Sequence, residues 1–106
     1  MFTVTFVLYE KSDLDRAEAL RYWRDTHGPI VAKVPGVQRY VQQQAVDAPD
    51  GQPPFLGVAS LYFDDQDAFG AAASSPEFAA AIADVHNFAD PDRLPTAFVE
   101  DVVIVG

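Results

Sequence analysis

The sequence contains no cysteine and only two histidines among its 106 residues. Without cysteine there can be no disulfide scaffold, thiolate catalysis or cysteine-ligated zinc, and this agrees with the reducing cytoplasm in which we expect the protein. The two histidines, His27 and His86, stand far apart and lack the short His/Glu spacing of zinc enzymes, so we expect no metal centre. No Gly-x-Gly-x-x-Gly or Walker motif is present, and we expect no cofactor.

Basic residues are also scarce. The chain has seven Lys and Arg residues and 16 Asp and Glu residues, which gives a formal net charge of −9. Because nucleic acids and anionic membranes both require a basic surface, we expect neither as a partner. The imbalance is concentrated in residues 40–106, with one basic and eleven acidic side chains, whereas residues 1–39 hold six and five. These basic residues either belong to a solvated helix surface or make the first part of the chain the place where an anionic ligand would be tolerated best.

Long hydrophobic runs are missing as well. No stretch approaches the roughly 20 apolar residues that span a bilayer, and the start of the chain lacks the basic segment of a signal peptide. We therefore expect neither membrane insertion nor export. Hydrophobic residues still make up 49% of the chain, an ordinary value for a globular protein. We expect a single domain over residues 1–106, with a core that needs no metal or disulfide.

Hydrophobic patterning predicts four strands and two helical regions. The strands are expected at 2–9, 37–46, 55–63 and 96–105, and the helical regions at Leu14–His27 and 64–85. Asp13 or Ser12 should cap the first helix, and the second region should break near Ser74 and restart with Ser75 as N-cap and Pro76 in the first turn. The order β-α-β-β-α-β predicts an α+β, ferredoxin-like fold, with a four-stranded antiparallel sheet and the helices on one face.

Two predicted strands carry apolar residues on both faces. In the third strand, one face is fully apolar and the opposite face also carries large nonpolar side chains, Val58 and Tyr62. In the first strand, the second face likewise carries Val7 and Tyr9. A sheet covered by helices on one side should present a polar second face to water. We therefore expect the helix-free face to pack on a second copy, so that two sheets pair into a dimeric α/β barrel.

His27 lies at the end of the first predicted helix, within the segment YWRDTHGPIVAKVPG. A helical wheel places it on the buried stripe with Leu20 and Trp23, and we expect Gly28 and Pro29 to end the helix there. Two interpretations fit this position. His27 is either an imidazolium at the helix C-terminus, worth ~0.3–1 kcal/mol when exposed, or a titratable group in an apolar pocket, usable as acid or base.

Three other side chains are candidates for the same site. Tyr40 either offers its hydroxyl to a substrate oxygen or to the imidazole, or is a half-buried cross-strand aromatic, and the strand pattern does not fix which face it occupies. Trp23 either packs in the core or contacts substrate. His86 either ends the second helical region or closes the pocket. Asp25 and Asp84 point away from the core on the helical wheel, so we expect no carboxylate–histidine pair.

The segment YWRDTHGPIVAKVPGVQRYV resembles the signature of the EthD domain family, within the dimeric α/β-barrel superfamily. The likeness rests on Trp23, His27, the Gly28-Pro29 breaker, the Pro35-Gly36 turn and the Arg39-Tyr40 pair, with weaker support from SSPEF and NFAD. It implies a ferredoxin-like protomer, two sheets paired into a barrel, and a pocket between helices and sheet that Tyr40 faces. The superfamily includes lactone isomerases, polyketide cyclases and dehydratases, cofactor-free monooxygenases and haem-degrading enzymes, so the fold does not select a reaction.

The residues and the resemblance together predict a cofactor-independent enzyme of small-molecule catabolism or secondary metabolism. His27 would act as general acid–base with Tyr40, in isomerisation, dehydration or decarboxylation next to a carbonyl. Trp23 and His86 would contact a compact, largely apolar, oxygen-bearing substrate. Two alternatives stay open: a non-catalytic ligand-binding or accessory subunit of an oxidative degradation pathway, and a cofactor-free oxygenase.

Overall fold

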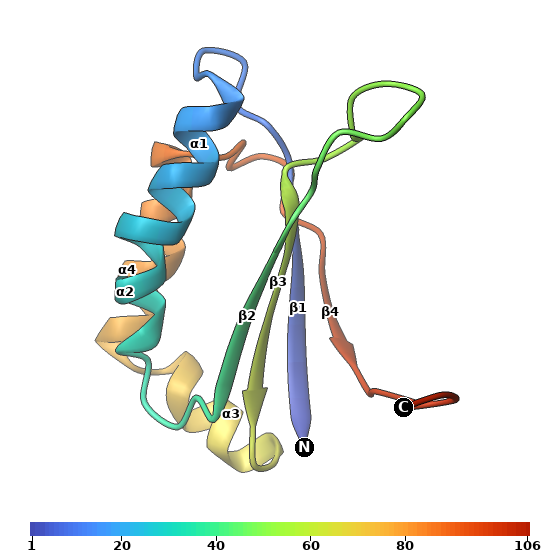
Figure 1. The fold of residues 1–106 in the computed structure, drawn as a ribbon. Helices are drawn as coiled ribbons and strands as arrows, with labels where there is room; N and C mark the ends of the chain where they lie inside the picture. Colours follow the sequence, from blue (N-terminus) through green and yellow to red (C-terminus); the bar gives the residue numbers. More distant parts are fainter.

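The computed structural model describes all 106 residues, and it consists of one antiparallel sheet with every helix on the same side (Figure 1). The strands are β1 (Phe2–Leu8), β2 (Arg39–Gln44), β3 (Gly57–Phe63) and β4 (Thr96–Val99), arranged in the order β2-β3-β1-β4. The helical segments are α1 (Arg16–Tyr22), the π turn η1 (Trp23–His27), α2 (Gly28–Ala32), α3 (Gln66–Ala73), α4 (Pro76–Asp84) and the 3₁₀ turn η2 (Val85–Asn87). The predicted ferredoxin-like α+β fold is confirmed. None of these helices combines the length and the hydrophobicity needed to cross a membrane.

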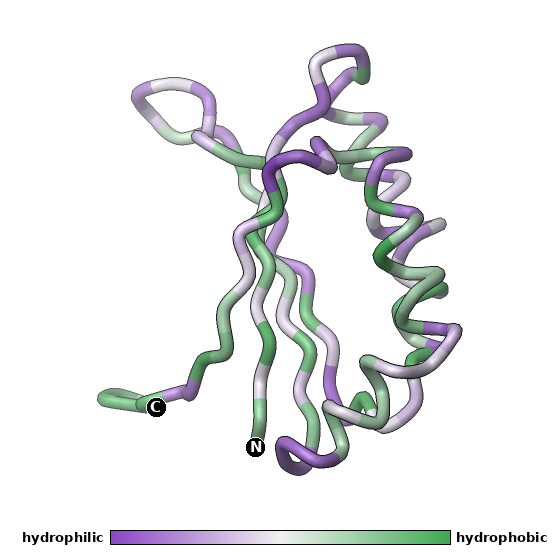
Figure 2. The backbone as a smooth tube through the Cα atoms, turned by 180° about the vertical axis from the view of Figure 1, so that it is seen from behind, coloured by the Kyte–Doolittle hydropathy of each residue, from purple (hydrophilic) through white to green (hydrophobic).

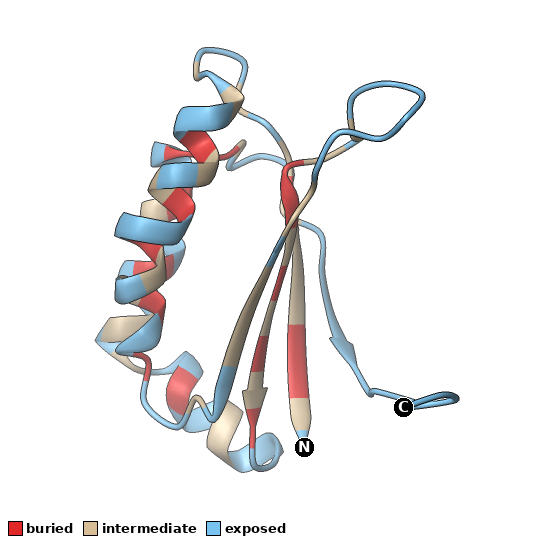
Figure 3. Cartoon of the chain, viewed as in Figure 1, coloured by how far each residue is buried: buried red, intermediate tan, exposed pale blue.

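The core fills the space between the sheet and the helices. β3 alternates strictly between buried and half-buried residues, because successive side chains on a strand point to opposite faces. Buried segments, red in Figure 3, lie on the helices and on the strands that they cover. By their contacts the buried residues form two groups, one around Trp23 and Phe88 and the other around Val4 and Phe63. Phe6 and Tyr40 pack against both groups, so the junction between the two halves of the core lies beside these rings.

The first helical segment does not end where the sequence predicts. It continues through Gly28 and Pro29 as far as Ala32, and the backbone N–H of Gly28 bonds to the carbonyl of Trp23, five residues earlier. Proline inside an α-helix lacks an N–H and clashes with the carbonyl four residues before it, and a π turn widens the helix locally. The turn ends at His27, two residues before Pro29, so the helix passes the proline instead of stopping at His27.

The ends of other elements also differ from expectation. The first helix follows Asp15, without a side-chain capping bond, and not Ser12 or Asp13. The break in the second helical region is as predicted, because Ser75 caps α4 by accepting a hydrogen bond from the Phe78 N–H at 3.1 Å.

The fourth strand is much shorter than the predicted 96–105. In β4, Val99 pairs with Thr3 near the beginning of β1, so the chain beyond it soon runs past its neighbour and has no strand to bond. Residues 100–106 lead away from the body of the protein without regular structure, and the end of the chain is largely hydrophobic (Figure 2). The side chains of Val102–Val105 are exposed.

Candidate functional site

A small apolar cavity lies where the two parts of the core meet. Its volume is about 40 Å³, more than the roughly 10–15 Å³ that one water requires. Thirteen of the fourteen lining residues are hydrophobic, and His27 is the exception. Side chains from β1, β2 and β3 form one wall, and residues of η1, α2 and α4 form the other. The heteroatoms of the lining side chains therefore belong to three residues alone: His27, Tyr40 and Trp23.

His27 is paired with a carboxylate from the other side of the helical layer. Its Nδ1 lies 2.8 Å from Oδ2 of Asp84, the last residue of α4, and the two side chains are 7% and 11% exposed. The second carboxylate oxygen of Asp84 accepts hydrogen bonds from the Tyr22 hydroxyl at 2.7 Å and from Asn87 Nδ2 at 2.9 Å. The imidazole also lies against the Phe88 ring, with 4.7 Å between ring centroids. These contacts fix the orientation of the His27 ring.

Burial and hydrogen bonding set the protonation of this pair. Burial works to raise the pKa of Asp84, but hydrogen bonds from Tyr22, Asn87 and His27 outweigh it, and the pKa lies below its usual value. Burial is the largest influence on His27 and lowers the pKa of the imidazole, against the opposing effect of Asp84. Near neutral pH the carboxylate is therefore ionised and the imidazole neutral, with its proton on Nδ1 facing Asp84. Nε2 carries a free lone pair and has no hydrogen-bond partner in the protein.

Tyr40 lies on the helix-facing side of β2 and lines the same cavity as His27. Its phenol oxygen accepts a hydrogen bond from Gln42 Nε2 at 2.8 Å, and the same nitrogen donates to the Trp23 carbonyl at 2.8 Å. Both hydrogens of that amide are then used, so the phenol keeps its own proton to donate elsewhere. Burial raises the pKa of Tyr40, which keeps the hydroxyl protonated.

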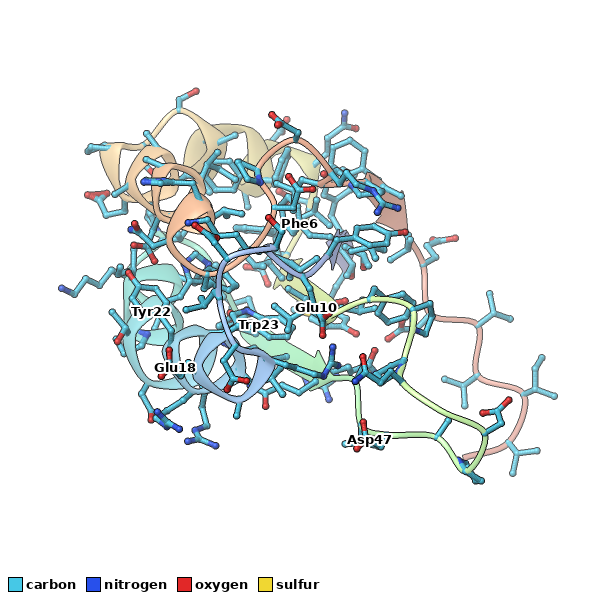
Figure 4. The ribbon with its side chains drawn as sticks, turned by 90° about the horizontal axis from the view of Figure 1, so that it is seen from above. Phe6, Glu10, Glu18, Tyr22, Trp23 and Asp47 are labelled. Atoms are coloured by element: carbon cyan, nitrogen blue, oxygen red, sulfur yellow. The ribbon has the colours of Figure 1, made fainter.

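The structure separates the two residues expected to bind substrate. Trp23 is fully buried and lines the cavity, and Figure 4 shows it between the first helix and the strand that carries Phe6. His86 is exposed, contributes nothing to the cavity lining, and bonds through Nδ1 to the Ala83 carbonyl at 2.7 Å. His86 thus occupies the helix-end position that was its alternative interpretation. No three His, Asp or Glu side chains converge to hold a metal.

The prediction that Asp84 points away from the site is wrong. A helical wheel separates the core side of one helix from its solvent side, but it takes no account of a neighbouring helix. Because α2 and α4 pack side by side on the sheet, the flank of α4 faces the first helical segment and is covered. A signal was present in the sequence: Asp84 ends an apolar helix, where the helix dipole disfavours a carboxylate unless donors surround it.

Sequence reasoning also missed three supporting residues: Tyr22, Asn87 and Gln42. Consecutive glutamines in a predicted strand were the available signal for Gln42, since long polar side chains on an inward face need partners. Gln42 and Gln44 bond to the carbonyls of Trp23 and Leu20 and thereby tie β2 to the helix. Tyr22 and Asn87 had no comparable signal, because their roles depend on how the helices pack.

The fold class defined by this arrangement is a ferredoxin-like α+β protomer with a pocket between helices and sheet. The profile of the EthD domain matches residues 11–92, and the chain belongs to this family. An 11.0 kDa protein from the thcB–thcC intergenic region of Rhodococcus erythropolis is 37% identical over 90 residues, 84% of each chain. The resemblance found in the sequence is thus confirmed.

Solved structures share the same fold. An EthD family protein from Bacillus halodurans superposes with a TM-score of 0.78 at 25% identity, covering 96% of this chain and 100% of the other. A dimeric ferredoxin-like protein from Thermobifida fusca superposes with a TM-score of 0.69 at 12% identity, covering 92% and 88%. At such low identity the second likeness concerns the fold alone.

Proposed function

We propose that the chain is a cofactor-independent acid–base enzyme acting on a compact, largely apolar molecule that carries an oxygen. The observation that supports this most strongly is the buried His27–Asp84 pair, with the imidazole on the wall of an apolar cavity. A buried histidine whose partner fixes its tautomer has the arrangement of a general base. The apolar walls favour a substrate whose carbon skeleton lacks charge.

The proposed chemistry is proton transfer next to a carbonyl. Nε2 of His27 takes a proton from the carbon beside the C=O, and the C–H electron pair moves into an enolate. Asp84 stabilises the imidazolium that forms, and the Tyr40 hydroxyl donates to the substrate oxygen. The imidazolium then returns the proton to another carbon in an isomerisation, or to a leaving group in a dehydration. A positioned histidine typically contributes ~10²–10⁴-fold to such a step.

Deuterium uptake by small ketones, at the carbon beside the carbonyl, tests this proposal without knowledge of the natural substrate. Small ketones incubated with the protein in D₂O should take up deuterium beside the carbonyl, measured by NMR or mass spectrometry. His27→Gln should reduce the exchange rate by ~10²–10⁴-fold, whereas the exposed His86→Gln should leave it unchanged. Equal exchange in the wild-type protein and His27→Gln would contradict the assignment of the base.

A non-catalytic ligand-binding role is the second candidate, favoured by the small size of the cavity and its single titratable imidazole. In that case ketones would bind with no exchange above the uncatalysed rate. Oxygen consumption during turnover would point instead to a cofactor-free oxygenase.

We also propose that two copies pair through the helix-free face of the sheet. Val7, Val41 and Val58 lie on that face and remain half-exposed in the single chain. The similar structure from Thermobifida fusca is described as dimeric, which supports the same assembly here.

A further inference from the structure

The indole nitrogen of Trp23, Nε1, takes no part in the hydrogen bonds of the site described above. This nitrogen is buried and makes no hydrogen bond of acceptable geometry, although the Tyr40 oxygen lies near it, and no other buried side-chain N or O shares this condition. Leaving a buried donor unpaired costs about 1–3 kcal/mol, so such atoms are rare and call for an explanation. The residue lines the cavity, so a ligand oxygen held there is the natural acceptor.

The surrounding residues fix how the indole lies. A Cβ at Gly57 would come within 2.6 Å of Trp23 Cζ3 and 2.7 Å of Cη2, so the far edge of the six-membered ring abuts the backbone of β3. The five-membered ring, which carries the N–H, is at the opposite end of the indole. The N–H lies close enough to the Tyr40 oxygen to favour the ionised phenol and so counter the rise in its pKa, yet it does not reach hydrogen-bond geometry.

Tyr40, on β2, lines the same cavity as Trp23 from the side of the sheet. Since Gln42 donates to the phenol oxygen, the Tyr40 proton is directed away from that amide. Two donors, the indole N–H from η1 and the phenol O–H from β2, thus lie close together beside a cavity whose only other side-chain heteroatoms are those of His27.

We propose that the Trp23 N–H and the Tyr40 O–H form a two-donor subsite for one substrate oxygen, and that the substrate is therefore an enolisable ketone or an enol-like, phenolic compound. This inference rests on the proposed acid–base function. Both donors strengthen their bonds as negative charge develops on the oxygen, while His27 Nε2 accepts the proton from the adjacent carbon. A hydrocarbon offers the pair no acceptor, and an ether oxygen accepts hydrogen bonds but develops no negative charge for the pair to stabilise.

The protein contains a single tryptophan, so its indole N–H gives one signal in a ¹⁵N–¹H NMR spectrum. Phenol serves as the probe because it is a planar enol mimic, and toluene has the same size without the oxygen. Titration with phenol should move the indole proton signal downfield and saturably, and toluene should not. Absence of a phenol-specific downfield shift, whether phenol binds elsewhere or not at all, would overturn the subsite.

Replacement of Trp23 by 3-benzothienylalanine keeps the ring system and exchanges the N–H for sulfur. Phenol binding should weaken by roughly twofold to tenfold, the effect of one hydrogen bond, while toluene binding stays the same. Trp23→Phe, compared through the ratio of phenol to toluene affinity, provides a second variant in ordinary expression systems. An unchanged ratio in both variants would contradict a role for the N–H. Since none of these measurements requires turnover, they can fail or succeed independently of the exchange assay on His27→Gln.

Discussion

The imidazole of His27 is surrounded by aromatic and aliphatic groups, yet it keeps one ionic partner. That combination makes its charge state depend on two opposing influences. Burial disfavours the imidazolium, and the Asp84 carboxylate favours it. Because burial is the larger influence, the imidazole remains neutral to a lower pH than a free histidine and can serve as a base throughout the neutral range.

This charge state predicts the pH dependence of the reaction. The value of kcat/KM, which reports the free enzyme, should fall on the acid side with a midpoint below 6.5, the pKa of an unperturbed histidine. Asp84→Asn removes the group that favours the imidazolium, so the acid limb should move to still lower pH while kcat also falls. A pH profile of deuterium exchange measures both effects. An acid limb centred above 6.5 in the wild-type protein would contradict the assignment.

Tyr40 provides the second prediction at the scale of single residues. Tyr40→Phe keeps the ring that packs against both parts of the core and removes one donor. We expect activity to drop by roughly tenfold to a hundredfold, ~1.4–3 kcal/mol, with an unchanged circular dichroism spectrum. Full activity in the variant would show that the hydroxyl does not contact the reacting oxygen.

The helices and strands hold the residues of the site in place by packing closely against one another. The π turn carries Trp23 and His27 past Pro29, and β3 comes so close to the indole that residue 57 has no room for a side chain. The packing of α2 beside α4 then brings Asp84 to the imidazole. The site is therefore assembled from the flanks of helices as well as from their core-facing stripes.

Two glycines make the packing at this scale testable. Gly57→Ala should destabilise the fold by about 1–3 kcal/mol, because its Cβ would clash with the Gln43 carbonyl oxygen and lie 2.6 Å from the fully buried Trp23 ring. Gly70→Ala is the matched control in α3, where nothing lies within 4 Å and the helix should gain about 0.5–1 kcal/mol. Urea denaturation measures both changes. A neutral Gly57→Ala would mean that both Trp23 and the β2 backbone at Gln43 can move aside freely.

At the scale of the whole molecule, one face of the sheet and one terminal segment remain uncovered. The helix-free face combines half-exposed valines with a Thr5–Ser60 hydroxyl pair at 2.9 Å. Beyond β4, the four residues Val102–Val105 are each at least 74% exposed in the single chain. Exposed apolar surface of this extent is typical of an interface.

Light scattering at micromolar concentration should therefore give the mass of a dimer. Val58→Lys places a charge on the helix-free face and should shift the protein toward the monomer, since stable interfaces of this type commonly bury more than ~2,000 Å² and exclude unpaired charge. Ala71→Lys, on the exposed side of α3, is the control and should leave the mass unchanged. A monomeric wild-type protein would rule out the paired barrel.

The fold and part of the site were readable from local signals. Period-two alternation, the Ser75 cap and the order of the elements are properties of neighbouring residues, so they predicted the sheet, the break before α4 and the ferredoxin-like arrangement. The burial of His27 followed from its place on the apolar stripe. The family signature from Trp23 to Tyr40 is equally local, and the match over residues 11–92 confirmed it.

The remaining features were decided by tertiary structure, because they depend on which parts of the chain pack against one another. The length of β4 was set by where β1 begins, and the continuation of the helix past Pro29 by a π turn that spacing alone does not reveal. Asp84 reached His27 because two helices pack side by side, a contact between residues 57 positions apart that no single helical wheel contains. Sequence alone thus singled out His27 as the candidate base, whereas the packing of helix on helix and strand on helix determined which carboxylate it pairs with and which side chains line the cavity.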